Sequence, residues 1–288
     1  MSLRARVPAT VANLGPGFDA LALAVDIVNE VELDTEAHPA VVVEGEGAGE
    51  LPEDASNLVF RSMAYLAREA GGSLPPFRMR CRNAIPLERG LGSSAAATVA
   101  GIVLANELLG AGLDPHGLLQ VAVDIEGHPD NVAACVFGGL VVAYLSREGW
   151  RAERLDPHPT LRPVVLVPGE ERVRTADARR VLPREVPLSD AAHNVGRAAL
   201  AVVALTARPQ LLLEAVEDRI HQARRLALAP ASRALFQDLR EAGVPVCVAG
   251  AGPSLLAFET DASAIPELGP GWRILRPSFA QGAELKEF

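Results

Sequence analysis

The sequence predicts a mixed α+β protein made of two domains. Three observations predict this class. Strand and helix patterns are interleaved along the 288 residues, a glycine-rich loop opens into a long apolar helix at 93–109, and a charged, proline-rich run at 146–163 has the composition of a connection between domains. A chain of this length can bury a core in each of two domains. We place the boundary near residue 155, so the predicted domains span 1–155 and 156–288.

The first predicted domain opens with a strand at 4–7 and continues with a loop at 8–19 that is dense in turn-forming residues. Further strands are indicated by valine-rich or alternating patterns, and helices by apolar runs that begin at N-cap residues. The strands lie at 21–35, 40–44, 77–82 and 137–144, and the helices at 57–70, 93–109 and 114–126.

The second predicted domain has the same mixture of elements. A buried strand is expected at 164–168 and three helices at 189–206, 209–226 and 231–242. A strand, a glycine turn and a second strand are expected within 244–258, where a plain hairpin turn explains the glycines nearly as well as a functional loop does.

The strand at 77–82 carries Arg78, Arg80 and Arg82 on one face, because successive side chains of a strand point to opposite sides. Such a row could be a nucleic-acid surface or a solvated face of the sheet. The formal net charge of −9 favours the solvated face. The same charge argues against nucleic acid or an anionic membrane as the main partner.

Basic residues are almost all arginine. The sequence has 27 lysines and arginines together, and the single lysine is Lys286, near the C-terminal end. A phosphate-loop lysine, a Schiff-base lysine and a lysine nucleophile are therefore excluded unless the tail folds back into a site. Any phosphate site has to use backbone N–H groups, hydroxyls, arginine and metal.

Three isolated cysteines, Cys81, Cys135 and Cys247, have no paired spacing. This pattern fits a reducing compartment and contains no zinc motif. The N-terminal residues lack the unbroken apolar run of an export signal, and the longest apolar segments are too short to span a bilayer. We therefore expect a cytoplasmic protein with no membrane partner.

The stretch at 86–96, Pro-Leu-Glu-Arg-Gly-Leu-Gly-Ser-Ser-Ala-Ala, predicts a phosphate-binding loop. Gly90 and Gly92 allow positive φ and a close approach of the backbone to an anion. Ser93 and Ser94 begin the following helix and add hydroxyl donors to its unpaired N–H groups, where the helix dipole also favours negative charge. The alternative is a glycine turn that simply caps a buried helix.

The pattern Pro-x-x-x-Gly-Leu-Gly-Ser-Ser-Ala at 86–95 resembles the second motif of the GHMP kinases, small-molecule kinases that include galactokinase, homoserine kinase, mevalonate kinase and phosphomevalonate kinase. The segment 12–19, Ala-Asn-Leu-Gly-Pro-Gly-Phe-Asp, resembles the first motif and is closest to the homoserine kinase branch. The glycine turn at 249–254 resembles the third. The resemblance covers almost the whole chain and implies a GHMP kinase fold, with an N-terminal nucleotide-binding α+β domain and a C-terminal ferredoxin-like domain.

The resemblance also implies an activity. It is the Mg²⁺-dependent transfer of the γ-phosphoryl group of ATP to the side-chain hydroxyl of L-homoserine, a step towards threonine, by a homodimer. Asp19 together with Arg179 and Arg225 favours a zwitterionic substrate over the runner-up, a mevalonate-like alcohol. A nucleotide-binding regulator that has lost catalysis is a further alternative, and a nucleic-acid-binding module is the weakest.

Nucleotide contacts are implied along the loop and at two positions outside it. The implied residues are Pro86, Gly90, Leu91, Gly92, Ser93, Ser94, Ala95, Ala96, Asn57 and Thr175. Asn57 has a second interpretation as the N-cap of the helix at 57–70. A carboxylate beside a nucleotide loop is a hard oxygen ligand for Mg²⁺, so Glu126 and Ser94 are the expected metal ligands.

Substrate contacts are implied in the first motif and in the cluster Glu-Gly-His-Pro-Asp-Asn at 126–131. Asn13 and Asp19 would contact the amino acid, with Asp19 facing its ammonium group. His128 and Asn131 would contact the substrate from the other side. Outside a nucleotide site, the same cluster would be an exposed helix end, a loop histidine and an N-cap aspartate.

Arginines complete the implied site. Arg179 would reach the substrate carboxylate or the transferred phosphoryl group, because its planar fork binds either one through two hydrogen bonds. Arg225 would bind the carboxylate, with Arg224 as the alternative. Asn131 stands where some relatives carry a general base and cannot accept a proton, so we expect Asn131 and Arg179 to be the catalytic residues. The neighbouring Asp130 is expected to point away from the site.

Overall fold

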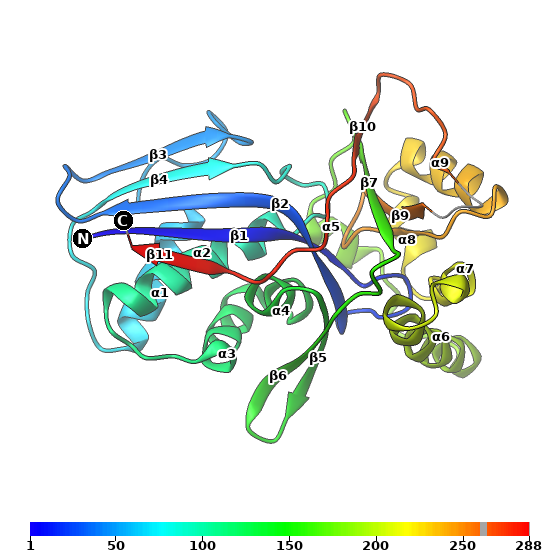
Figure 1. Ribbon diagram of the computed structural model, residues 1–288, viewed down its shortest axis with the longest axis horizontal. Helices are drawn as coiled ribbons and strands as arrows, with labels where there is room; N and C mark the ends of the chain where they lie inside the picture. The colour runs from blue at the N-terminus through cyan, green and yellow to red at the C-terminus, as the bar shows by residue number, and fades with distance from the viewer. Residues whose placement is uncertain (260–263, 288) are drawn as a thin grey trace.

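The computed structural model describes residues 1–259 and 264–287, and its N-terminal half is built on a seven-stranded sheet (Figure 1). The strand order is β11-β1-β2-β4-β3, with β5 beside β2 and β6 beside β5. Its pairs are antiparallel apart from β3 and β4. The strands are β1 (Ser2–Ala12), β2 (Leu21–Asp34), β3 (Ala40–Gly45), β4 (Arg78–Asn83), β5 (Leu140–Ser146), β6 (Gly149–Leu155) and β11 (Glu284–Glu287).

Four helices belong to this half and gather on one side of the sheet (Figure 1). They are α1 (Leu58–Glu69), α2 (Ser93–Leu108), α3 (Pro115–Glu126) and α4 (Asp130–Phe137). The predicted caps are confirmed, since Asn57 caps α1, Asp114 caps α3 with Pro115 behind it, and Gly127 ends α3 in the left-handed conformation.

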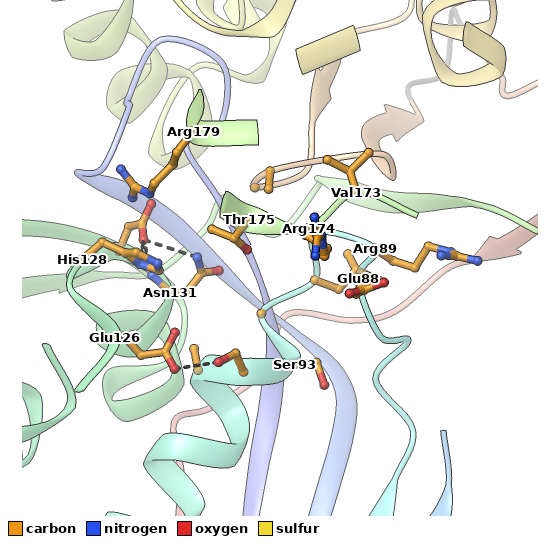
Figure 2. Close-up of a pocket in the computed structure, with 18 of the residues that line it drawn as sticks. Glu88, Arg89, Ser93, Glu126, His128, Asn131, Val173, Arg174, Thr175 and Arg179 are labelled. Carbon is orange, nitrogen blue, oxygen red and sulfur yellow. Dashed lines mark hydrogen bonds and ion pairs between the residues drawn. The ribbon is translucent and has the colours of Figure 1, made fainter. Parts of the chain in front are cut away.

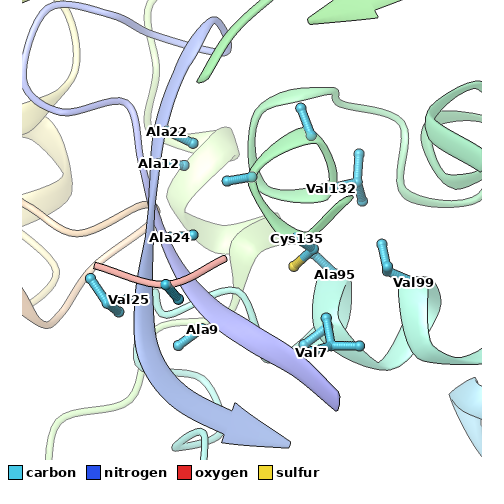
Figure 3. Close-up of a cluster of buried hydrophobic side chains, with 14 of the residues drawn as sticks. Val7, Ala9, Ala12, Ala22, Ala24, Val25, Ala95, Val99, Val132 and Cys135 are labelled. Carbon is cyan, nitrogen blue, oxygen red and sulfur yellow. The ribbon is translucent and has the colours of Figure 1, made fainter. Parts of the chain in front are cut away.

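Helix α2 lies at the centre of this layer and is apolar on nearly all sides, as the sequence predicts. Figure 3 shows Ala95 and Val99 of α2 beside Val7 of β1 and Cys135 of α4. The facing residues are small and buried, so the helices and the sheet pack closely. This packing fixes the first turn of α2, where the glycine loop ends.

The loop predicted from residue 8 is wrong for 8–12, because β1 continues to Ala12. Pro8 has no N–H to give to the ladder, and the pairing with β2 shifts register between Pro8 and Ala9. Beyond this bulge, pairing resumes between 9–12 and 22–25. The true loop therefore begins at Asn13.

The C-terminal half contains a second sheet in the order β10-β7-β9-β8, which is the strand order of a ferredoxin-like sheet. Its strands are β7 (Arg162–Pro168), β8 (Val246–Val248), β9 (Leu255–Glu259) and β10 (Trp272–Leu275). The helical segments of this half are α5 (Thr175–Arg180), α6 (Leu188–Thr206), the 3₁₀ turn η1 (Pro209–Leu211), α7 (Leu212–Ala215), α8 (Gln222–Leu226) and α9 (Pro230–Glu241).

The connection between the two predicted domains, expected at 146–163, is shorter in the structure. Residues 149–155 form β6, which pairs with β5 as a hairpin of the first sheet and leaves 156–161 as the link to β7. The chain also returns to the first sheet at its end, where β11 pairs with β1 and brings the two termini to the same edge (Figure 1). The division at residue 155 stays a prediction.

The single helix predicted at 209–226 is wrong, because the helical segment that begins at Pro209 ends at Ala215. The carboxylate of Asp218 accepts hydrogen bonds from the N–H groups of Ile220, His221 and Gln222. An aspartate that bonds nearby backbone competes with a continuous helix and begins a new one. The break turns His221 and the short helix α8 towards the N-terminal half.

The predicted solvated sheet face is confirmed. Arg80 and Arg82 pair with Glu32 and Glu44 across β4, β2 and β3, at distances of 2.9 to 4.0 Å. Opposite charges therefore alternate along this face, which does not present a continuous basic surface. Within 1–259 and 264–287 the structure contains no helix long and apolar enough to cross a membrane.

Two helical glycines provide a matched test of this packing. A Cβ at Gly101 of α2 would collide with the carbonyl oxygen of Val59 in α1, whereas a Cβ at Gly196 of α6 would meet nothing within 4 Å. Gly101→Ala is expected to destabilise the fold by about 1 to 3 kcal/mol through overpacking. Gly196→Ala is expected to stabilise it by up to about 1 kcal/mol through helix propensity. Urea unfolding measures both, and a stabilised Gly101→Ala protein would contradict the packing described for α2.

Candidate active site

The glycine loop adopts the conformation that phosphate binding needs. Gly90 has φ 73° and Gly92 has φ 71°, both in the left-handed region that disfavours other residues. A Cβ at Gly90 would collide with Ala249 O, and one at Gly92 would collide with the Thr10 hydroxyl. The loop then enters α2, so the free N–H groups of the first helical turn face the space in front of it.

That space is a cavity of about 590 Å³ between the two halves of the chain. Figure 2 shows side chains from the glycine loop, from 126–131 and from 173–179 converging on it. Most residues predicted for the site line this cavity, namely Asn13, Asp19, Pro86, Gly90, Leu91, Gly92, Ser93, Ser94, Ala95, Glu126, His128, Asn131, Thr175, Arg179 and Arg225.

Two predicted residues do not line it. Ala96 is fully buried and its N–H donates to Gly92 O at 2.8 Å, so neither its side chain nor its N–H is free to meet a nucleotide. Asn57 lines a neighbouring cavity of about 450 Å³, which shares Ser93 and Ser94 with the first. Its amide is already engaged with Val59 N and Pro52 O, as an N-cap requires.

The expected metal ligands lie together. Ser94 donates a hydrogen bond of 2.7 Å to Glu126 Oε1, and Thr98, which the sequence interpretation missed, donates one of 2.8 Å to the same oxygen. This carboxylate and these hydroxyls are the hard oxygen donors that Mg²⁺ prefers. Among the described residues, no group of three or more His, Cys, Asp and Glu side chains is arranged so that it could hold a metal ion by itself. The donor set therefore fits an ion that completes its coordination with phosphate oxygens and water.

Asp19 and Arg179 form an ion pair across the cavity. The Arg179 guanidinium donates to both carboxylate oxygens of Asp19, at 2.8 and 3.1 Å. The two side chains remain 32% and 38% exposed, so solvent screening limits what the pair adds to stability. The residues expected to meet an ammonium group and a carboxylate thus neutralise each other in this structure.

Asn13 holds the backbone of its loop in place. Its Oδ1 accepts the N–H of Asp19 at 3.1 Å, and its Nδ2 donates to Gly250 O at 3.1 Å. Asn13 and Asp19 have φ values of 71° and 54°, which are uncommon for residues with a side chain. The amide therefore ties the first motif to the third one, and its predicted contact with a substrate stays a prediction.

Arg225, and not the alternative Arg224, lines the cavity, since Arg224 is exposed. Arg225 is 4% exposed and donates a hydrogen bond of 2.6 Å to Gly250 O. Its guanidinium lies 5.3 Å from the centre of the Phe18 ring. Burial lowers the pKa of Arg225 to about 10, with a smaller opposing effect of Asp19. The side chain therefore remains a cation at neutral pH.

Asp130 was expected to point away from the site and instead lines the cavity. Its Oδ1 accepts hydrogen bonds from Asn131 N at 2.7 Å and Asn131 Nδ2 at 3.3 Å, and lies 3.4 Å from His128 Nδ1. The Thr10 hydroxyl donates to Asn131 Oδ1 at 2.8 Å. The first turn of α4 places both neighbouring side chains on the cavity. No helix was predicted at 130–137, and Asp130 is the first residue of α4, not the N-cap that the alternative interpretation gave it.

Further charged residues line the cavity without a sequence signal. Arg61 of α1, Glu88 and Arg89 of the glycine loop, and Arg174 before α5 were not predicted for the site. No motif marks them, because their position depends on how the two halves pack. The lining as a whole combines backbone donors, hydroxyls and arginines with a few carboxylates, which suits a polyanion and a small charged partner.

Comparison with known proteins agrees with this geometry. Residues 57–139 match the protein family described as the GHMP kinases N terminal domain. The chain is 47% identical over 294 residues to the homoserine kinase of Streptomyces avermitilis, covering 99% of this chain and 95% of the relative. It is 45% identical over 303 residues to the homoserine kinase of Rhodococcus erythropolis, covering 99% and 96%.

The chain belongs to the homoserine kinase family.

Solved structures support the fold of this family member. The crystal structure of homoserine kinase from Cytophaga hutchinsonii aligns with a TM-score of 0.83 at 30% identity, covering 99% of this chain and 97% of that one. Mevalonate diphosphate decarboxylase from Staphylococcus aureus aligns with a TM-score of 0.67 at 17% identity, which shows a shared fold alone. The GHMP kinase fold predicted for this chain is therefore confirmed.

The contact between His128 and Asp130 is expected to make the stability of the protein depend on pH. The Asp130 carboxylate raises the pKa of His128 above its usual 6.5, against the opposing effect of burial. The contribution of this pair to stability is therefore fully present below about pH 6.5 and is lost as the pH rises through the raised pKa. NMR titration is expected to show a His128 pKa above that of free histidine and a lower one in Asp130→Asn. The exposed, remote His38 is the internal control, and an unshifted His128 in the parent protein would contradict the contact.

Proposed function

We propose that this protein transfers the γ-phosphoryl group of ATP to the side-chain hydroxyl of L-homoserine, forming O-phospho-L-homoserine on the route to threonine. One observation carries the proposal. A glycine loop suited to a polyphosphate and side chains complementary to a zwitterion line the same cavity of about 590 Å³. The names of the relatives with 45% and 47% identity point to the same substrate.

The nucleotide would bind along the glycine loop. Its phosphates would meet the N–H groups of 90–95 and the hydroxyls of Ser93 and Ser94, at the positive end of the α2 dipole. Its base would extend into the neighbouring cavity beside Asn57. Ser94 and Glu126 would hold Mg²⁺, which when bound neutralises charge on the phosphate oxygens.

The acceptor would bind at the opposite wall. Asp19 would receive the ammonium group, while Arg225 and Arg179 would receive the carboxylate. The pair between Asp19 and Arg179 would open as the zwitterion replaces each partner by a group of the same charge. A mevalonate-like alcohol has no ammonium group, so Asp19 would face it without a partner. This difference favours the amino acid.

Positioning and charge neutralisation would supply most of the catalysis, as is general for phosphoryl transfer. Asn131 would orient the acceptor hydroxyl, and Arg179 would stabilise charge on the phosphoryl group in transit. The hydroxyl oxygen forms the new bond to phosphorus, and the bond from phosphorus to the ADP oxygen breaks. The hydroxyl proton passes to a phosphoryl oxygen late in the reaction, because Asn131 cannot accept it.

We also propose that the protein works in the cytoplasm as a homodimer. Cys81, Cys135 and Cys247 are buried and form no disulfide in the described structure, which suits a reducing compartment. The dimer follows from the family resemblance. Size-exclusion chromatography with light scattering measures the oligomeric state directly.

The experiment that tests this function is ADP release from ATP and Mg²⁺ with L-homoserine, mevalonate, L-serine and L-threonine as separate acceptors. Turnover is expected with L-homoserine alone; mevalonate in particular lacks the ammonium group that Asp19 would receive. Turnover with mevalonate alone would overturn the substrate while keeping the phosphate site. Nucleotide binding with no turnover on any acceptor would favour the regulator.

A further inference from the structure

Arg89 occupies a variable position of the glycine motif, and neither the motif nor the proposed mechanism gives it a role. It is only 7% exposed. Figure 2 shows its guanidinium turned away from Asn131 and Glu126, towards the C-terminal half of the chain. A long cation buried inside the glycine loop, yet directed away from Asn131 and Glu126, needs a physical explanation.

The guanidinium is bound to the end of β7. Its Nε donates to Pro168 O at 3.1 Å, and its Nη2 donates to Gly169 O at 2.8 Å. Two donors of one planar fork therefore grip two successive carbonyl oxygens where the strand leaves the second sheet. The rigid fork specifies both a distance and an orientation, which an ammonium on a flexible stem would not do.

Main-chain bonds connect the same part of the loop to the C-terminal half. Arg89 O accepts the N–H of Ser254 at 3.3 Å, and Glu88 O accepts the N–H of Val173 at 3.1 Å. The side-chain fork of Arg89 thus lies between two backbone contacts. The loop is held by the turn after β8 on one side and by the segment after β7 on the other.

The segment bound by Arg89 leads directly to α5, which carries a residue proposed to bind the acceptor. Residues 169–174 connect the end of β7 to α5, which begins at Thr175 and carries Arg179. Both of these side chains line the cavity. The attachment of Gly169 to Arg89 therefore relates the position of the phosphate loop to the position of α5.

Stability alone explains this arrangement poorly. Among the described residues, Arg89 Nη1 is buried and has no hydrogen-bond partner, and the hydrogen bonds that the guanidinium makes go to neutral carbonyls. Burial lowers the pKa of Arg89, although the carboxylates of Glu46 and Glu88 act in the opposite direction. A buried cation whose hydrogen bonds go only to neutral carbonyls costs free energy. The geometry that the planar guanidinium imposes on residues 168 and 169 explains better why an arginine stands at position 89.

We propose that Arg89 is a positioning residue that sets the separation between the phosphate loop and α5, and so the alignment of donor and acceptor. The role rests on the proposed phosphoryl transfer. The guanidinium of Arg89 is bound to Pro168 O and Gly169 O, so Arg89 acts through Gly169 and the segment that follows it. Loss of the fork would leave both binding surfaces present but misaligned.

The first test compares kinetics of Arg89→Met, Arg89→Lys and a control, Arg273→Met. Arg273 of β10 also joins the two halves, through an ion pair of 2.9 Å with Glu46, but lies outside the cavity. We expect Arg89→Met to lower kcat on the order of 100-fold, the effect of a misplacement of about 1 Å, with little change in nucleotide Kd. Arg89→Lys should recover part of kcat, and Arg273→Met should match the parent.

The second test is chemical rescue. Guanidinium chloride at millimolar concentrations should raise the kcat of Arg89→Ala in a saturable way, because the ion can occupy the vacated site and donate to the same carbonyls. It should not raise the kcat of Arg273→Met. Thermal unfolding of each variant shows whether the protein is folded under assay conditions. If Arg89→Ala is unfolded, the kcat of the folded Arg89→Lys variant still tests the role of Arg89.

The third measurement is independent of turnover. Hydrogen exchange should be faster in peptides 86–96 and 169–180 of Arg89→Met, and unchanged in Arg273→Met. Unaltered exchange in both peptides, a kcat close to the parent, or a loss confined to nucleotide Kd would overturn the role of Arg89. A parent protein that does not phosphorylate L-homoserine would instead overturn the proposed function, and the exchange result would still decide whether Arg89 holds the loop.

Discussion

The site depends on one close backbone contact between the two halves of the chain. The glycine loop lies so near the turn at 249–252 that a Cβ at Gly90 would collide with Ala249 O, and a Cβ at Gly250 would lie 2.8 Å from Gly90 O. Only glycine permits this approach at the φ values observed. The contact helps to form one cavity between the two sheets, with the glycine loop on one side and α5 and Arg225 on the other.

The chemistry of the cavity follows from a sequence that is nearly free of lysine. Lys286 lies in β11 at the edge of the first sheet, where it pairs with Glu284 at 3.6 Å, and so supplies no charge to the site. The groups available for phosphate are oriented N–H groups, hydroxyls and arginines. The N–H groups of the glycine loop are held in place by the fold, and donors oriented in this way are suited to stabilising charge in a transition state.

Local signals predicted much of this structure, and the errors have both local and non-local causes. The caps at Asn57, Asp114 and Gly127 and the glycine loop depend on near neighbours in sequence, so their patterns were informative. The extension of β1 past Pro8 depends on its pairing with β2. The β5–β6 hairpin and the break at Asp218 are formed by residues only a few positions apart, but the strand and helix patterns did not distinguish them from a loop and from a continuous helix. The inward position of Asp130 and the burial of Ala96 were missed because each is decided by how a helix packs.

The most direct test of the account is a crystal structure with Mg²⁺, a non-hydrolysable ATP analogue and L-homoserine bound together. The account predicts the phosphates on the N–H groups of 90–95, the amino acid between Asp19 and Arg225, and an opened pair between Asp19 and Arg179. The oxygen of the acceptor hydroxyl should lie about 3 to 3.5 Å from the terminal phosphorus atom of the analogue. Phosphates bound away from the glycine loop, or an amino acid bound outside this cavity, would contradict it.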